Sequence, residues 1–374
     1  MDEKNREHVI IDNGSGTTKA GFSGELVPQI VFPTVIGKPK HTGITFETIQ
    51  KDVCFGSDAQ NKEDLLNLTY PIERTLVMNW DHMEKIWHHI FHNELYIQPD
   101  EHRVLLTEAP LTPKARREKV PEIMFEKFHV LGMYLGLQPM LSLFGNGMIT
   151  GLVFEAGDGM AQSTPVYEGT AYEVAVSRLN LAGCDLTDSL LKMLREKGYS
   201  LTTNLERETI RDIKEKFTYV AEDYQSELKK AETSTDIERN YELPDGQIIT
   251  IGSERFQCPE ALFSATSNGY NKGIHTILYE SIMKCDIDFR STFYKSIVLA
   301  GGSTMFPNTD VRLTKEIAKL VSGTMTIKVI ASPQRKYSSW IGGSILCNLE
   351  SFQDMWVTQH EYDDSGPSIV HRRC

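Results

Sequence analysis

The sequence has few cysteines, and none of them lies in a paired motif. The six are scattered along 374 residues with no Cys-x-x-Cys spacing: Cys54, Cys184, Cys258, Cys285, Cys347 and Cys374. This pattern indicates neither a zinc site nor a disulfide framework. A chain that keeps its thiols reduced fits the cytoplasm best.

The sequence also lacks an excess of positive charge and a membrane segment. Its 39 basic and 51 acidic residues give a formal net charge of -12, which argues against non-specific nucleic-acid binding. The first eight residues are mostly charged and lack the apolar stretch of a signal peptide. Residues 130–154 carry no charged side chain, but they contain Gln138-Pro139, Asn146 and five glycines. They predict a buried helix, a turn and a buried strand, so we expect neither a membrane nor a nucleic-acid partner.

The sequence contains enough apolar residues for two or three domains. Hydrophobic residues make up 40% of the chain, so each domain can bury a core. Strand-like and helix-like patterns alternate, which is typical of an α/β architecture.

A glycine-rich turn near the start carries groups that suit a phosphate. The apolar strand Val9-Ile10-Ile11 ends at Asp12 and is followed by Gly14, Ser15, Gly16, Thr17 and Lys19. Glycines let backbone N–H groups converge on an anion, and Asp12 is placed to hold a hydrated Mg²⁺. For one such turn alone, a plain β-hairpin with solvated Asp12 and Lys19 is the commoner explanation.

Two further stretches favour a phosphate-binding turn over a plain hairpin. The apolar strand Leu152-Val153-Phe154 runs into Glu155 and then into Gly157, Asp158, Gly159 and Met160, with Gln162 beyond. This second copy suggests a duplicated domain whose halves each offer a loop to the same phosphates. The third stretch is the buried-strand pattern Ser296–Ala300 followed by Gly301, Gly302, Ser303, Met305 and Phe306. A glycine pair there suits close approach to a flat ligand such as a nucleoside.

The three stretches resemble the superfamily of sugar kinases, heat-shock chaperone ATPases and actins, and the chain is similar to the actin family from end to end. The matching segments are Asp12–Gly21, Tyr70–Glu73, Met83–His89, Leu105–Pro110, Arg211–Lys216, Tyr241–Gly246, Trp340–Leu346 and Gly366–His371. A sugar kinase or chaperone-type ATPase would share only the hairpins.

The resemblance implies two α/β halves of the ribonuclease H-like type around a nucleotide cleft, each with a mixed five-stranded sheet and helices. It places the first half at residues 1–140 with 338–374, with an insertion at about 34–70. The second half is then 141–337, with an insertion at about 182–270.

The resemblance also implies ATP or ADP as cofactor, with Mg²⁺ or Ca²⁺ held through water by Asp12 and Glu155. Catalytic roles fall on Asp12, Glu155 and two residues that position water, Gln138 and Gln162. The nucleotide-binding residues implied are Gly14, Ser15, Gly16, Thr17, Lys19, Gly157, Asp158, Gly159, Met160, Gly183, Arg211, Lys214, Glu215, Gly301, Gly302, Ser303, Met305, Phe306 and Lys336. By spacing alone, Arg211, Lys214 and Glu215 would be assigned to an ordinary solvated helix face.

Several positions depart from the family pattern. Glu155 replaces an Asp, Gln162 replaces a His that helps to position water, Arg74 replaces a His, and Thr112 replaces an Asn on the phosphate exit path. Gln138 and Arg178 are retained. We therefore expect ATP hydrolysis to be kept but slowed.

The resemblance implies self-assembly into filaments, and the assembly segments also differ. The loop His41–Asp52 offers Ile44, Phe46 and Ile49, which predict either a small local cluster or a contact with the next subunit. The loop Ser264–Asn271 is shorter and more polar than the apolar plug of the family, so we expect weaker cross-strand cohesion. The start, Asp2–Glu7, lacks the acidic cluster that myosin recognises, which does not favour motor binding. Monomer-binding and severing factors remain expected partners.

Local signals predict several elements. Apolar residues at helical spacing predict a helix over Asn79–Leu95. His88 and His92 lie four apart on its solvated face beside Glu84. They could be metal ligands, but without a third ligand signature we expect ordinary surface histidines. Another helix should begin with Thr112 as N-cap and Pro113 as first residue, and Pro121 should kink or end it.

The sequence thus predicts a divergent cytoskeletal, cytoplasmic member of the actin family that binds ATP and Mg²⁺, polymerises and hydrolyses ATP slowly. The alternative is a non-enzymatic actin-related subunit that keeps ATP as a structural cofactor in a larger complex.

Overall fold

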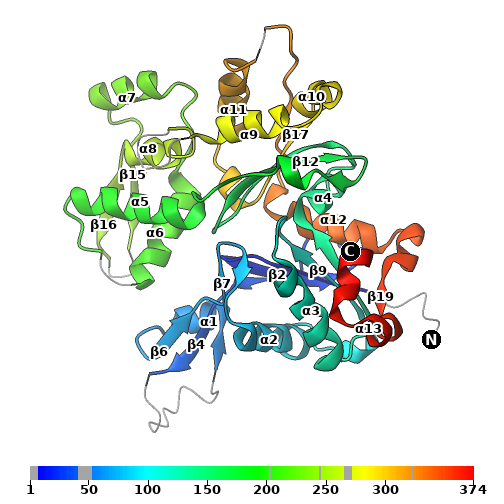
Figure 1. Ribbon diagram of the computed structural model, residues 1–374. Coiled ribbons are helices and arrows are strands. Elements are labelled where there is room, and N and C mark those ends of the chain that lie inside the picture. Colours follow the sequence, from blue (N-terminus) through cyan, green and yellow to red (C-terminus); the bar gives the residue numbers. More distant parts are fainter. Residues whose placement is uncertain (1–6, 41–52, 202–203, 244–245, 265–271, 322) are drawn as a thin grey trace. The chain divides into compact units, whose positions relative to one another are not determined.

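The computed structural model describes residues 7–40, 53–201, 204–243, 246–264, 272–321 and 323–374, which form two compact units (Figure 1). Unit 1 comprises Met1–Ile149, Val166–Glu173 and Tyr337–Cys374, and unit 2 comprises Thr150–Pro165 and Val174–Lys336. Each unit is built on a mixed β-sheet with helices, so the predicted α/β fold is confirmed.

The sheet of unit 1 has six strands rather than the expected five. Its order is β19 (Val357–Thr358), β10 (Gly132–Leu137), β9 (Arg103–Glu108), β1 (Val9–Asn13), β2 (Thr17–Phe22) and β3 (Ile30–Pro33). Strand β1 is parallel to β9 and antiparallel to β2, and β10 is parallel to β9. The short strand β19 lies at one edge and pairs with β10.

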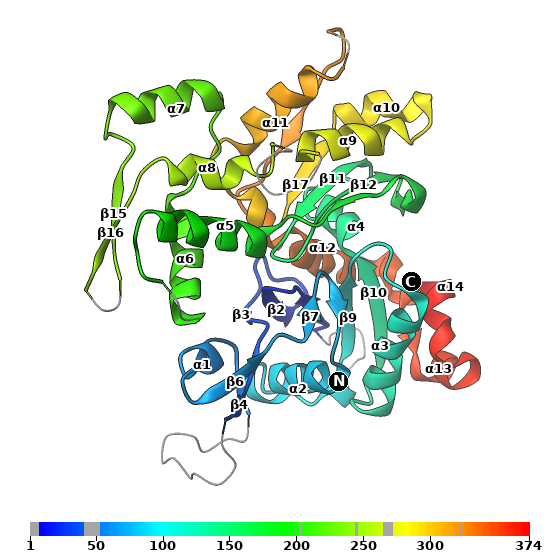
Figure 2. The same ribbon diagram turned by 60° about the vertical axis from the view of Figure 1, so that its left-hand side comes forward.

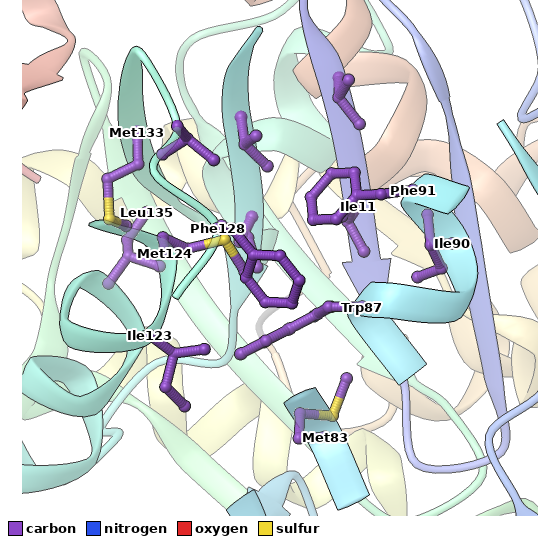
Figure 3. Close-up of a cluster of buried hydrophobic side chains, with 14 of the residues drawn as sticks. Ile11, Met83, Trp87, Ile90, Phe91, Ile123, Met124, Phe128, Met133 and Leu135 are labelled. Carbon is purple, nitrogen blue, oxygen red and sulfur yellow. The ribbon is translucent and has the colours of Figure 1, made fainter. Parts of the chain in front are cut away.

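Alternate residues of β1 enter two different hydrophobic clusters. Val9 and Ile11 pack in a cluster with the helices α2 (Trp80–His89) and α3 (Lys114–Glu126), whose side chains include Trp87 and Met124 (Figure 3). Ile10 packs in a second cluster with α4 (Gln138–Phe144) and α12 (Ser338–Cys347). Because successive side chains of a strand face opposite ways, the sheet is buried on both faces. Residues 145–149 follow α4 and lie in unit 1, where α4 packs closely against α12.

The remaining elements of unit 1 are short. They are β4 (Ile36–Pro39), β5 (Cys54–Phe55), α1 (Gly56–Gln60), β6 (Leu66–Thr69), β7 (Ile72–Glu73), β8 (Leu76–Val77), β13 (Thr170–Ala171), α13 (Gln359–Ser365) and α14 (Val370–Arg373). Strands β4, β5 and β6 form a separate three-stranded sheet.

The helix predicted over Asn79–Leu95 exists, but it changes type. Asn79 caps α2 by accepting from the His82 N–H at 2.9 Å. After His89 the chain continues as a π-helical turn, Ile90–Glu94, in which the Leu95 N–H donates to the Ile90 carbonyl at 2.9 Å. The buried face predicted from the spacing is confirmed, because Met83, Ile86, Trp87, Ile90 and Phe91 are all buried.

The predicted start of the next helix is wrong. The Thr112 hydroxyl donates back to the Ala109 carbonyl at 2.7 Å, so it does not cap the helix. Helix α3 begins one residue after Pro113, which has extended backbone angles. Pro121 lies inside α3, which continues to Glu126.

The second sheet also has six strands rather than the expected five. Its order is β13, β12 (Ala161–Tyr167), β11 (Gly151–Ala156), β17 (Ile297–Ala300) and β18 (Val329–Ile330), with β14 (Ser177–Leu179) also paired with β12. Strands β11, β17 and β18 are parallel neighbours. Figure 2 shows the helices α9 (Ile274–Met283), α10 (Ile287–Tyr294) and α11 (Thr309–Ala318) gathered beside this sheet.

The second part of unit 2 holds α5 (Gly183–Glu196), α6 (Asn204–Phe217), α7 (Tyr224–Thr233), α8 (Glu254–Glu260) and the hairpin β15 (Arg239–Glu242) and β16 (Ile248–Ile251). Gly198 follows the end of α5 with φ +97°, a conformation that favours glycine. Among the described helices, none combines the length and apolar character that a membrane crossing requires.

Candidate functional site

The turn of unit 1 admits only glycine at its first position. The Gly14 N–H donates to the Thr17 carbonyl at 3.1 Å, which closes the β1–β2 hairpin. A Cβ at Gly14 would lie 2.7 Å from that carbonyl oxygen. The N–H groups of Ser15 and Gly16 meet no acceptor among the described residues, so they can donate to an anion.

The carboxylate of Asp12 is buried at this turn and accepts three hydrogen bonds. The donors are Lys19 Nζ at 2.9 Å, Thr107 Oγ1 at 2.5 Å and Gln138 Nε2 at 3.1 Å. Burial by itself raises the pKa of Asp12, but the Lys19 charge and these bonds outweigh burial and lower the pKa. Asp12 is therefore ionised at neutral pH, as a cation ligand must be.

The plain-hairpin explanation is wrong, because Asp12 and Lys19 are only 4% and 9% exposed. Lys19, expected to face phosphate, donates its amine to Asp12, and Nζ lies 3.3 Å from the position of an added Cβ at Gly14 in the turn. Thr107 is a further neighbour of Asp12 that no sequence motif indicates. The parallel register that sets Leu106 beside Ile11 brings Thr107 next to Asp12, and a strand pairing of this kind is the only signal that could have found it.

The turn of unit 2 repeats the hydrogen bond of the first. The Gly157 N–H donates to the Met160 carbonyl at 3.1 Å, three residues on, as Gly14 does to Thr17. The duplication inferred from the two sequence patterns therefore extends to the geometry of both turns.

Glu155 and Gln162 lie side by side and buried next to this second turn. Gln162 Nε2 donates to Glu155 Oε2 at 3.1 Å. A carboxylate only accepts, so the amide nitrogen must face it and Oε1 must face away. That oxygen is buried and has no partner among the described residues. Because an unsatisfied buried acceptor costs about 1–3 kcal/mol, the position favours a bound donor such as water.

The second turn is held by the start of α5 and by the turn after β17. The Gly183 N–H and the Ser303 hydroxyl both donate to the Gly157 carbonyl, at 3.0 and 2.7 Å. A Cβ at Gly183 would lie 2.8 Å from Ser303 Oγ, 3.0 Å from Asp158 Oδ1 and 3.1 Å from the Asp158 Cα, so a larger residue would have to displace these neighbours. Lys214 Nζ donates to the Gly183 carbonyl at 2.7 Å and to Thr187 Oγ1 at 2.9 Å.

The charged residues predicted on the adenosine side form one group. Glu215 pairs with Arg211 at 3.3 Å and with Lys336 at 3.5 Å. Burial by itself raises the pKa of Glu215, but Lys336, Arg211 and Lys214 outweigh burial and lower it. Burial lowers the pKa of Lys214. Lys214 is buried, Arg211 is partly buried and Glu215 is exposed. With Lys336 they form a charged wall held by ion pairs, which faces solvent only in part.

The glycine pair after β17 has two distinct roles. Gly301 has φ +88°, and a Cβ on it would lie 2.4 Å from the Ala156 carbonyl oxygen. At Gly302, as at Gly157, an added Cβ would meet no protein atom within 4 Å. These two glycines therefore leave open space beside the turn. Met305 and Phe306 follow directly, after the 3₁₀ turn Gly302–Thr304.

The residues present fit a nucleotide with its cation. Unit 1 has a glycine turn beside the buried acidic residue Asp12, which suits phosphate and a hydrated cation. Unit 2 has the same kind of turn beside Glu155, and within that unit it also has open space at Gly157 and Gly302 and the charged wall. Within the described part of the chain, no cluster of three or more His, Cys, Asp and Glu side chains could hold a metal by itself. A cation carried with the nucleotide, held largely through water, agrees with that finding.

The retained Arg178 and the two other family departures, Arg74 and Thr112, have defined positions. Arg178 on β14 pairs in register with Gln162, and burial lowers its pKa. Arg74 and Thr75 form the tip of the β7–β8 hairpin with φ of 46° and 74°, a conformation that costs non-glycine residues energy. Thr112 lies in the turn before α3.

Several predicted features fall outside the described residues. They are the segment Asp2–Arg6, the loop 41–52 with Ile44, Phe46 and Ile49, and the loop 265–271. The contacts predicted for them stay predictions.

The sequence was compared with models of known protein families. A family model described as Actin matches residues 3–374. The match spans the turns of both units and the charged wall of unit 2.

Proposed function

The chain belongs to the actin family, and from that premise we propose that it binds ATP with Mg²⁺ or Ca²⁺, assembles into cytoskeletal filaments in the cytoplasm and hydrolyses ATP slowly to ADP and phosphate. The observation that carries the proposal is the repeated glycine turn with a buried acidic residue, Asp12 in unit 1 and Glu155 in unit 2.

Each group has a chemical role in this proposal. Ser15 and Gly16 donate backbone N–H groups to phosphate oxygens, because no acceptor in the described part of the chain takes them. Asp12 and Glu155 hold the hydrated cation, which neutralises charge on the phosphates when bound. Arg211, Lys214, Glu215 and Lys336 bind the adenosine side, and Gly302 leaves room for it.

The reaction itself depends on placing a water. Gln138 donates to Asp12, which fixes its amide, and Gln162 is fixed by Glu155. The free Oε1 of Gln162 can accept a hydrogen from a water, as glutamine does in GTPases, but an amide cannot take up a proton. We therefore assign these residues to orienting the water and expect a slow chemical step.

A second candidate function rests on the same pair. Because Glu155 and Gln162 depart from the family pattern, the protein could keep ATP only as a structural cofactor in a larger actin-related complex. Self-assembly separates the two functions, since a filament former alone should pellet above a critical concentration.

The test is sedimentation with ATP and Mg²⁺ over a range of protein concentrations, with phosphate release measured in the same samples. The proposal predicts pelletable polymer above a threshold and slow phosphate release that follows polymer mass. Bound ATP without polymer or phosphate release would support the structural-cofactor function. Myosin binding is not part of the proposal, whereas monomer-binding and severing factors are.

A further inference from the structure

Two histidines lie against one another on the outer side of α2 and of the π-helical turn that follows it. The ring centroids of His88 and His92 are 4.3 Å apart, and the ring planes are tilted by 56°. His88 is exposed and His92 is partly exposed. Residues four apart are neighbours on a helix surface. Trp87 and Phe91, one residue before each of them, are buried in the core and fix the backbone that carries the two rings.

The nitrogen atoms of these two rings have no hydrogen-bonding partner in the part of the chain that the structure describes. Neither ring has a hydrogen bond or ion pair with any described residue, and the only ring contact of each is the other histidine. The neighbouring histidines differ, because His89 pairs with Glu94 at 3.0 Å and stacks on Phe55, and His82 is buried. Glu84, one turn before His88, adds a negative charge that acts on it.

Two adjacent imidazoles suit a particular class of cation. Imidazole nitrogen is a good ligand for Zn²⁺, Ni²⁺ and Cu²⁺, whereas Mg²⁺ and Ca²⁺ prefer oxygen. We propose that His88 and His92 form a two-histidine chelate for a borderline divalent transition cation, with water completing its coordination. This site involves no residue of the nucleotide site and does not depend on the proposed function.

A cation held there would join two kinds of helix. His88 belongs to α2, and His92 belongs to the π-helical turn that begins at Ile90. π-Turns interrupt the regular hydrogen-bond ladder, here through the Leu95 N–H bond to the Ile90 carbonyl. A chelate across the junction should therefore slow the opening of this turn.

The binding test uses the full chain with its nucleotide and excess Mg²⁺, with Ni²⁺ as the probe in equilibrium dialysis. The variants are His88→Gln and His92→Gln, which keep a polar side chain of similar size. The control is His360→Gln, an exposed helical histidine on α13 with a carboxylate four residues on, Asp364, at 3.2 Å. We expect one Ni²⁺ to be lost, or its affinity to fall at least about 10-fold, in either variant and not in the control.

A second measurement separates the chelate from scattered surface binding. Hydrogen exchange of the Leu95 amide should slow on adding Ni²⁺ to the native chain and to His360→Gln, but not to His88→Gln or His92→Gln. Equal Ni²⁺ binding by all four proteins, no bound Ni²⁺ in the native chain, or unchanged exchange at Leu95 would overturn the proposal. Unchanged circular dichroism confirms that the variants are folded.

Discussion

The residues around the candidate site show how burial and pairing compete over a carboxyl group. Asp12 is buried, yet its pKa is lowered because Lys19, Thr107 and Gln138 all favour the charged form. Glu108 also has a basic partner, Arg117, at 2.7 Å, but its burial outweighs the pairing and raises its pKa to about 7. The glycine-rich motif of the sequence indicated Asp12 and Lys19. It could not indicate Thr107, because that contact depends on the register between strands far apart in the chain.

We predict that Glu108 makes the protein less stable as pH rises from about 4.5 to 7. In that range the folded protein keeps a proton that the unfolded chain has released, so each step upward in pH favours unfolding. The loss amounts to roughly 3 kcal/mol across the window. In Glu108→Gln this dependence should disappear. Urea unfolding should show that the variant's free energy of unfolding, relative to that of the native chain, is higher at pH 8 than at pH 5 by about that amount.

The control for this prediction is Glu232→Gln, an exposed change on α7. It should leave the pH dependence of unfolding as it is in the native chain. A Glu108→Gln variant whose stability follows the native pH profile would show that Arg117 keeps Glu108 ionised throughout.

The Glu155–Gln162 pair gives a second prediction at this scale. In Glu155→Asp with Gln162→His, phosphate release per polymerised subunit should rise several-fold. The histidine can accept a proton, and the shorter carboxylate would change the position of the waters around the cation. Position matters because a misplacement of about 1 Å can lower the reaction rate on the order of 10²-fold. An unchanged or lower rate would mean that the native pair is already tuned. Each single change should break the 3.1 Å hydrogen bond between Gln162 and Glu155 and should raise the rate less than the double change does.

At the scale of elements, periodicity was the reliable signal. It predicted both glycine hairpins, the strand β17 and the buried face of α2. The start of α3 was predicted wrongly, because the Thr112 hydroxyl bonds to the Ala109 carbonyl in a local turn, a choice that serine and threonine make as readily as capping. The π-turn Ile90–Glu94 was not predicted, since its apolar spacing is close to that of an α-helix.

The cap of α2 can be tested directly. Asn79→Ala removes the acceptor for the His82 N–H and should cost about 1 kcal/mol, a loss of a few degrees in Tm. Asn79→Asp keeps a side-chain oxygen at this position and should restore most of the stability, as thermal unfolding would show. If aspartate and alanine destabilise equally, the cap does not contribute to stability.

At the scale of the whole molecule, the sequence predicted two α/β parts with related glycine turns, and each unit contains a mixed sheet with one such turn. The sheets gained short edge strands such as β19, whose two residues carry too little pattern to be recognised. The charged wall of unit 2 needed the resemblance, because its residues lie on separate elements and only folding brings Lys336 to Glu215.

The central claim is that the chain binds ATP with Mg²⁺ through these turns, and thermal unfolding tests it most directly. A ligand that binds only the folded state adds about 2.7 kcal/mol at a concentration 100 times its Kd, so ATP with Mg²⁺ should raise Tm by several degrees. Lys19→Glu places a second carboxylate against Asp12 and should abolish the shift, whereas Lys192→Glu on the exposed face of α5 should keep it. No rise in Tm for the native chain at saturating ATP and Mg²⁺ would contradict the account.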